Sequence, residues 1–71
     1  MSTVDDIKAE AADIRHFAIC KLDWSRNPAV QKRYSGVPQT LEDIVRRAEN
    51  CMRAAARLEH YASVLEARAS A

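Results

Sequence analysis

His16 and Cys20 stand four residues apart, a spacing that lets two side chains of one helix bind the same zinc ion. A complete site needs more ligands, and the remaining candidates of these types are Cys51 and His60. In a helical hairpin with residue 24 opposite residue 40, Cys51 would lie roughly 10 Å along the axis from Cys20, and His60 farther still. We therefore expect no metal site. The same separation argues against a Cys20–Cys51 disulfide, and Cys51 is interpreted as a small buried hydrophobe.

Three carboxylates, Asp6, Glu10 and Asp13, share one face of the predicted first helix. Paired carboxylates can transfer protons or hold a hard cation. No glycine-rich phosphate loop, nucleophile elbow or helical His pair with an acid between accompanies them. The sequence therefore predicts a protein that is not an enzyme and has no cofactor. The acidic face is expected to be solvated, with contact to a basic partner as the alternative.

The segment from residue 23 to residue 40 gathers the only Trp, both Pro and the only Gly of the chain. Basic and aromatic side chains together can bind nucleic acid, and Trp, Tyr and Arg also dominate protein interfaces. A third interpretation is that the aromatic residues simply close the open end of the hairpin. The candidate partner-binding residues are Trp24, Arg26, Lys32, Arg33 and Tyr34.

Arginines along the last helix are a weaker candidate for phosphate binding. Three of them follow an acidic residue by four positions, the order that stabilises an isolated helix: Glu42–Arg46, Asp43–Arg47 and Glu49–Arg53. We interpret this stripe as a neutralised outer face. A helix-turn-helix reading fits poorly, because the last helix carries Ala and Leu where a recognition helix needs polar side chains.

Two shorter elements precede that helix. Apolar residues recur at spacings of three and four and predict a helix over residues 3–23: Val4, Ile7, Ala11, Ile14 and Ala18, with Phe17 and Leu22 widening the stripe. Asn27 and Pro28 are typical of an N-cap and a first helical position. Gly36 and Pro38 indicate a stop. The connector is therefore expected to contain a short helix of its own.

The last helix is predicted over residues 41–69. Thr40 and Asp43 resemble a capping box, with Asp in place of the usual Glu or Gln. A four-heptad seam follows, in which Leu41 and alanines alternate with larger residues: Leu41, Ile44, Ala48, Cys51, Ala55, Leu58, Ala62, Leu65 and Ala69. Small residues in every other layer favour close antiparallel packing. The predicted fold is all-α, an antiparallel helical hairpin with a short helix in the connector.

The two long helices differ in predicted length, roughly 43 Å against 31 Å at 1.5 Å per residue. The first helix should then leave about two C-terminal turns of the last helix uncovered. Exposed apolar stripes usually mark association, so we expect a homodimer that forms a helical bundle. The predicted dimer interface is Cys51, Ala55, Leu58, Tyr61, Ala62 and Leu65.

Composition sets the limits on these interpretations. The 71 residues predict a single domain, 1–71, with a thin core. Two cysteines, no secretory signal and no long apolar run predict a cytoplasmic protein that does not enter the membrane. The net charge of +1 is uneven: residues 1–20 hold four acids and two bases, and residues 21–35 hold four bases and one acid.

In size and composition the chain resembles the very small helical proteins by which phages and mobile elements disable a host regulator or defence protein. This resemblance covers no motif and transfers no functional residue. It implies a non-enzymatic inhibitor or adaptor that sequesters a larger protein with an acidic surface. The alternatives are a nucleic-acid-binding regulator using the basic connector, and a purely structural self-associating coiled-coil subunit.

Overall fold

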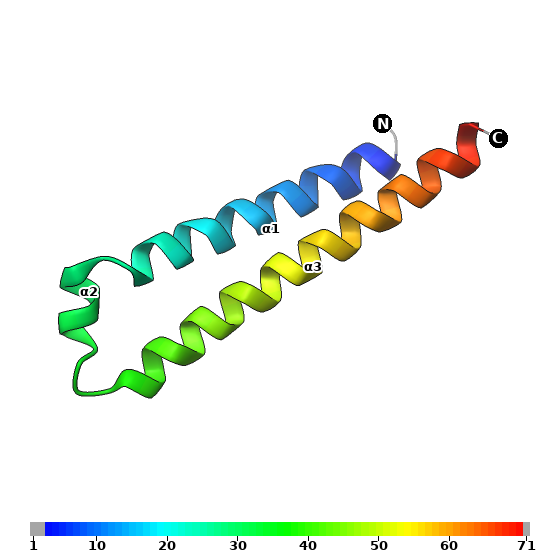
Figure 1. Cartoon of the computed structure of the whole chain (residues 1–71). Helices are drawn as coiled ribbons and strands as arrows, with labels where there is room; N and C mark the ends of the chain where they lie inside the picture. The colour runs from blue at the N-terminus through cyan, green and yellow to red at the C-terminus, as the bar shows by residue number, and fades with distance from the viewer. Residues whose placement is uncertain (1–2, 71) are drawn as a thin grey trace.

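The computed structural model describes residues 3–70 and contains three helices, α1 (Thr3–Ser25), α2 (Pro28–Arg33) and α3 (Pro38–Ser70). The two long helices α1 and α3 run antiparallel, α2 lies across the end that joins them, and both termini lie at the opposite end (Figure 1). The described residues contain no strand. The all-α fold with two long helices and a short one between them is thus confirmed. The molecule is a rod of 55 × 17 × 13 Å.

The start of α2 follows the predicted capping pattern. The Asn27 side-chain oxygen accepts a hydrogen bond of 2.9 Å from the Ala29 amide, and Pro28 occupies the first turn, where its missing N–H leaves no bond unmade. The helix ends at Arg33, with Tyr34 as its C-cap. Gly36 lies beyond it, and its φ is not positive. Its place in the turn therefore does not depend on the freedom of glycine to be left-handed.

The start of α3 differs from the prediction. The helix begins at Pro38, so Thr40 lies inside its first turn, and the Thr40 amide donates to the Val37 carbonyl at 3.0 Å. Asp43 pairs with Arg46 at 3.2 Å. The predicted capping box is wrong because proline, which tolerates the first helical turn, starts the helix before Thr40 can cap it.

A line of small side chains forms the contact between α1 and α3. The buried residues recur every seven positions: Ala11, Ala18 and Ser25 on α1, and Leu41, Ala48, Ala55 and Ala62 on α3. Small residues let the two backbones approach closely, as expected for the antiparallel seam. The helix α2 adds Val30 to this core. Val30 and Leu41 are the largest buried side chains in residues 3–70.

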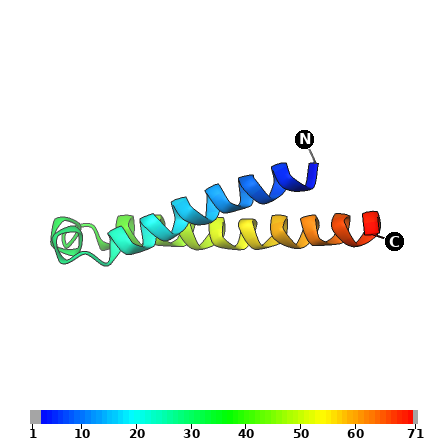
Figure 2. The ribbon, with the colours of Figure 1, turned by 90° about the horizontal axis from the view of Figure 1, so that it is seen from above.

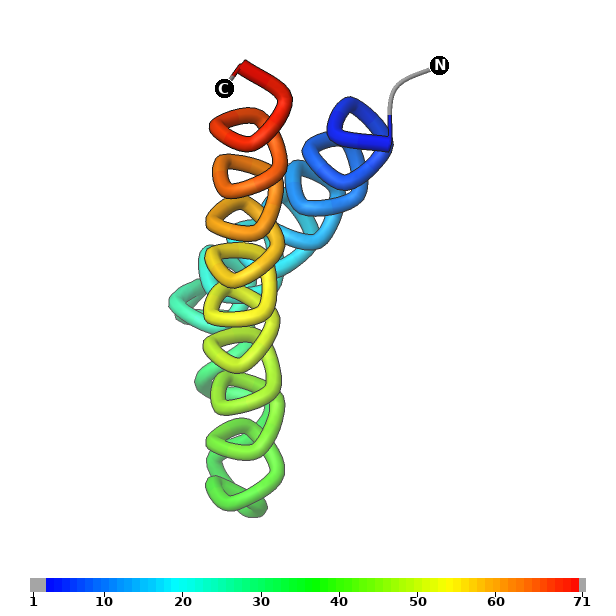
Figure 3. The backbone as a smooth tube through the Cα atoms, turned by 90° about the vertical axis from the view of Figure 1, so that its right-hand side faces the viewer, coloured from blue at the N-terminus to red at the C-terminus, as the bar shows by residue number. Residues whose placement is uncertain are grey.

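Two ion pairs show how far α1 extends along α3. Lys8 pairs with Glu66, and Arg15 pairs with Glu59. These contacts bring the first turns of α1 beside the last turns of α3, although α1 inclines away from α3 toward the free ends (Figures 2 and 3). The expected uncovered C-terminal stretch of α3 is therefore wrong. It is the first turns of α3 that extend past α1, and there the connector packs on them.

No helix within residues 3–70 combines the length and the apolar character that crossing a lipid bilayer requires.

Candidate functional site

The connector end of the hairpin carries the five predicted partner-binding residues, and we call this region the basic corner: Trp24, Arg26, Lys32, Arg33 and Tyr34. Trp24 and Tyr34 meet edge to face, with ring centroids 5.9 Å apart and an interplanar angle of 79°. This is a favoured geometry for an aromatic pair. Both rings are half-buried. The pair therefore ties the end of α1 to the end of α2.

Polar contacts hold the same joint from its other side. The Gln31 side-chain amide donates to the Ser25 carbonyl at 2.6 Å, and the buried Ser25 hydroxyl donates to the Leu22 carbonyl at 2.6 Å. Val30, which directly precedes Gln31, is buried. The basic corner is thus a braced structure, on which side chains keep a fixed spacing.

The three bases of the corner extend into solvent. The Arg26 side chain is 77% exposed and lies 4.0 Å from Asp23, a long contact for an ion pair. Lys32 and Arg33 are exposed in the last turn of α2, and within residues 3–70 neither has an ion-pair partner. Lys21 behaves differently, since its ammonium group lies 5.1 Å from the Trp24 ring centroid. Lys32 and Arg33 therefore remain free to meet an anionic surface, and Arg26 is exposed with a single long contact to Asp23.

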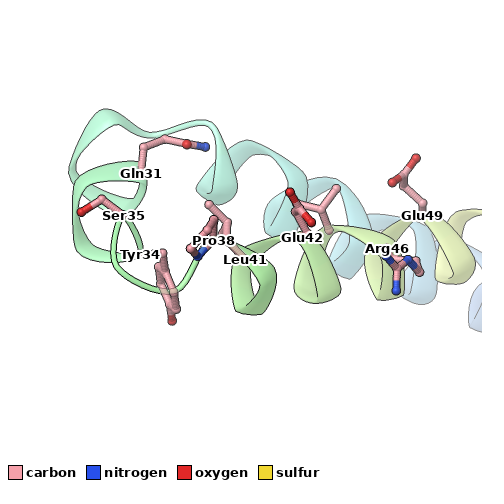
Figure 4. A pocket seen from close by; sticks show the side chains of 9 residues that line it. Gln31, Tyr34, Ser35, Pro38, Leu41, Glu42, Arg46 and Glu49 are labelled. Carbon is pink, nitrogen blue, oxygen red and sulfur yellow. The ribbon is translucent and has the colours of Figure 1, made fainter.

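An open groove of about 490 Å³ lies beside the corner, between the connector and the first turns of α3 (Figure 4). Tyr34, Leu41 and Val45 give it apolar walls, and charges of both signs line it: Glu42, Arg46 and Glu49. The sequence analysis did not predict this groove. The feature of the sequence that pointed to it is that Val45 lies outside the strict seam of α3.

The two sides of the α1–α3 contact differ in chemistry. One side, the ion-pair flank, carries Lys8, Arg15, Glu59 and Glu66, which cross-link the helices. Hydrogen bonding to the Glu66 carboxylate, and its charge, raise the pKa of Lys8 above its ordinary value.

The opposite side carries apolar side chains, and we call it the apolar flank. Helical periodicity places six of them there: Ile14, Phe17, Cys51, Ala54, Leu58 and Tyr61. Phe17 is 57% exposed and Tyr61 is 53% exposed. A groove of about 220 Å³ opens on this flank, lined by Phe17, Lys21, Ile44, Arg47, Ala48 and Cys51. Two of the exposed large apolar side chains, Phe17 and Tyr61, thus lie on this flank, and a third, Ile19, is exposed elsewhere on α1.

The predicted dimer-interface residues fall into two groups. Ala55 and Ala62 are fully buried between α1 and α3, so no second chain can reach them. Cys51, Leu58 and Leu65 are half-buried, and Tyr61 is exposed. Phe17, which is exposed beside these residues, was not among the predicted ones. It could have been found from its position seven residues before Trp24, on the edge of the first apolar stripe.

The residues considered for metal or acid–base chemistry do not converge. The Cys20 sulfur lies 3.6 Å from His16 Nε2, and both residues are exposed. Among residues 3–70, no three His, Cys, Asp or Glu side chains are placed to share a metal ion. Cys20 and Cys51 are both free thiols. The carboxylates of Asp6, Glu10 and Asp13 are exposed on α1.

None of the protein families, curated proteins or solved structures compared with this chain matches it.

Proposed function

We propose that this protein is a small non-enzymatic binding module that self-associates and captures a larger protein through the basic corner. The partner presents an acidic surface. The observation that carries the proposal is the set of three exposed bases on a braced joint, of which Lys32 and Arg33 have no ion-pair partner within residues 3–70 and Arg26 has only a 4.0 Å contact with Asp23. A rigid frame lowers the entropy lost on binding, because less of the surface must be ordered. By size and composition, the activity we propose is that of a phage- or mobile-element-type inhibitor or adaptor.

One feature of the corner favours a protein partner over nucleic acid. Single-stranded nucleic acid binds by stacking bases on open aromatic faces. Trp24 is instead occupied by the edge contact with Tyr34 and by the Lys21 ammonium group.

The test compares variants in capture from a lysate of candidate host cells, followed by mass spectrometry. The triple variant Arg26→Ala, Lys32→Ala, Arg33→Ala should lose a partner that the parent retains, with binding at least tenfold weaker. Its matched control, Arg53→Ala, Arg57→Ala, Arg68→Ala, removes the same charge from α3 far from the corner and should retain that partner. Equal capture by both triple variants would place binding elsewhere on the molecule.

Fluorescence anisotropy of labelled DNA tests the alternative function, a nucleic-acid-binding regulator. Salt-dependent binding that only the corner variant loses would favour a nucleic-acid-binding regulator. A chain that binds neither a protein nor DNA would fit the structural coiled-coil subunit.

A further inference from the structure

We propose that the apolar flank is a homodimer interface and that its occupant is a second copy of this chain. This inference rests on the proposed self-association and assigns it to a face. The predicted interface lay on α3 alone. The structure instead points to a surface shared by α1 and α3, with Phe17 and Tyr61 as its exposed apolar side chains.

The exposed surface of the chain is larger than its mass predicts. It amounts to 5376 Å², whereas a folded monomer of this mass exposes about 4,450 Å². The radius of gyration is 16.2 Å, against about 11 Å for a compact domain of this length. The excess of about 900 Å² is spread over the whole rod and is of the same order as the roughly 800 Å² that each partner contributes to a standard interface. One copy therefore exposes enough surface for a standard interface.

The core explains why that surface needs covering. Alanines make up most of the buried seam, and the largest buried side chains in residues 3–70 are Val30 and Leu41. Apolar burial stabilises a fold by about 25 cal/mol per Å², so small side chains contribute little. The larger apolar residues Ile14, Ile44 and Leu58 remain half-buried beside the seam. A second copy over this flank would complete their burial.

The two flanks are not equivalent as interfaces. Charged side chains cross-link the ion-pair flank, and covering them would require desolvation of Lys8, Arg15 and their partners. On the apolar flank, the groove beside Phe17 is lined by the half-buried thiol of Cys51 and by two bases, Lys21 and Arg47. Neither base is in an ion pair within residues 3–70, so covering this groove breaks no cross-link between the helices. The thin core needs a partner that is present wherever the chain folds. A second copy of the chain meets this requirement. In a dimer with a twofold axis, both copies use the same face as their interface.

Light scattering after size exclusion tests the assignment with matched variants. At tens of micromolar the parent should be a dimer, and Phe17→Glu and Tyr61→Glu should be monomers or weaken the dimer at least tenfold. Ile19→Glu is the control. It is 42% exposed on the same helix, and two residues of a helix turn by about 200°, which directs it away from Phe17. This variant should remain dimeric. Circular dichroism verifies that each variant keeps its helices.

The native cysteines test the same face without any substitution. Cys51 lines the groove of the apolar flank, and exposed Cys20 lies outside it. Alkylation of Cys51 by iodoacetamide should slow at least tenfold as protein concentration rises through the dimerisation range. Alkylation of Cys20 should not change. This measurement decides the matter if a glutamate variant fails to fold.

The outcomes separate the inference from the proposal beneath it. A parent that stays monomeric at tens of micromolar overturns both the self-association and the assigned face. A parent dimer that survives Phe17→Glu and Tyr61→Glu, or that leaves Cys51 unprotected, overturns the face alone. Loss of the dimer in these two variants, with Ile19→Glu dimeric and Cys51 protected, supports the inference.

Discussion

At the scale of single residues, the start of α2 depends on a particular side chain, and the turn after the helix does not. Asn27 accepts the Ala29 amide, so the start of the helix depends on a side-chain oxygen. Such caps contribute about 1 kcal/mol each. Gly36, after the helix, has an ordinary negative φ, and a Cβ built on it meets no atom within 4 Å. The start of the helix therefore has a chemical requirement that the turn after it lacks.

Replacing Gly36 by alanine should leave the fold intact and raise the free energy of unfolding by about 0.4–1 kcal/mol, because alanine lowers the entropy of the unfolded chain. Urea denaturation followed by circular dichroism measures the change. Asn27→Ala is the comparison and should destabilise the protein by about 1 kcal/mol. A loss of stability in Gly36→Ala would show that this turn needs a backbone conformation closed to alanine.

At the scale of the elements, the spacing between α1 and α3 is set by alanines that leave no room for more atoms. Ala55 is fully buried in this seam, whereas its neighbour Ala56 is exposed. The same substitution at these two positions therefore measures packing alone, since both lie in the interior of α3.

Ala55→Leu should lower the free energy of unfolding by about 1–3 kcal/mol, because extra methyl groups would force the two helices apart. Ala56→Leu should change it by only a few tenths of a kcal/mol, the difference in helix propensity. Chemical denaturation of both variants makes the comparison. Equal stability of the two would contradict the close packing of the seam.

The ion-pair flank gives a second prediction at this scale. Glu66 raises the pKa of Lys8, so the folded state binds this proton more tightly than the unfolded chain does. The stabilisation is present below the unfolded-state pKa of about 10.4 and is lost as pH rises through the higher folded-state value.

A titration of Lys8 by NMR should give a pKa above the ordinary lysine value, and Glu66→Gln should return it to that value. Glu59→Gln is the matched control, because Glu59 pairs with Arg15 instead and should leave the Lys8 titration unchanged. An unshifted Lys8 in the parent would mean that the first turns of α1 do not lie beside Glu66.

At the scale of the whole molecule, the long narrow shape governs stability. A rod of 55 × 17 × 13 Å leaves few positions far from water, and a domain of this length has a marginal core even when compact. Anything that binds the folded chain and not the unfolded one stabilises it by mass action. A second copy bound as proposed would have this effect, which grows with the logarithm of protein concentration.

The melting temperature should therefore rise with protein concentration between about 1 and 100 micromolar, because dimer formation is coupled to folding. Differential scanning calorimetry measures it, with Phe17→Glu as the control. That variant should melt lower and show little dependence on concentration. A parent whose melting temperature is constant over this range would be a folded monomer.

The sequence by itself determined the helices. The seven-residue recurrence of alanines, the apolar stripe of α1 and the Asn27–Pro28 start are local patterns, and each predicted an element that the structure contains. Helix α1 ends two residues later than predicted, and α3 begins three residues earlier, because Pro38 can occupy the first turn of a helix. The five residues of the basic corner lie together at one end of the hairpin, as expected for near neighbours along the chain, and their role in binding stays a prediction.

Tertiary structure alone decided how the helices align and which side of them faces solvent. A heptad pattern repeats every seven residues, so it specifies a face but not how far α1 extends along α3. That extent is visible in Lys8–Glu66 and Arg15–Glu59, contacts between residues more than 40 positions apart. In this alignment the pairs lie on one flank, and Phe17 and Tyr61 are exposed on the other. Contacts of this kind depend on the geometry of two packed helices, and no local pattern within either helix encodes them.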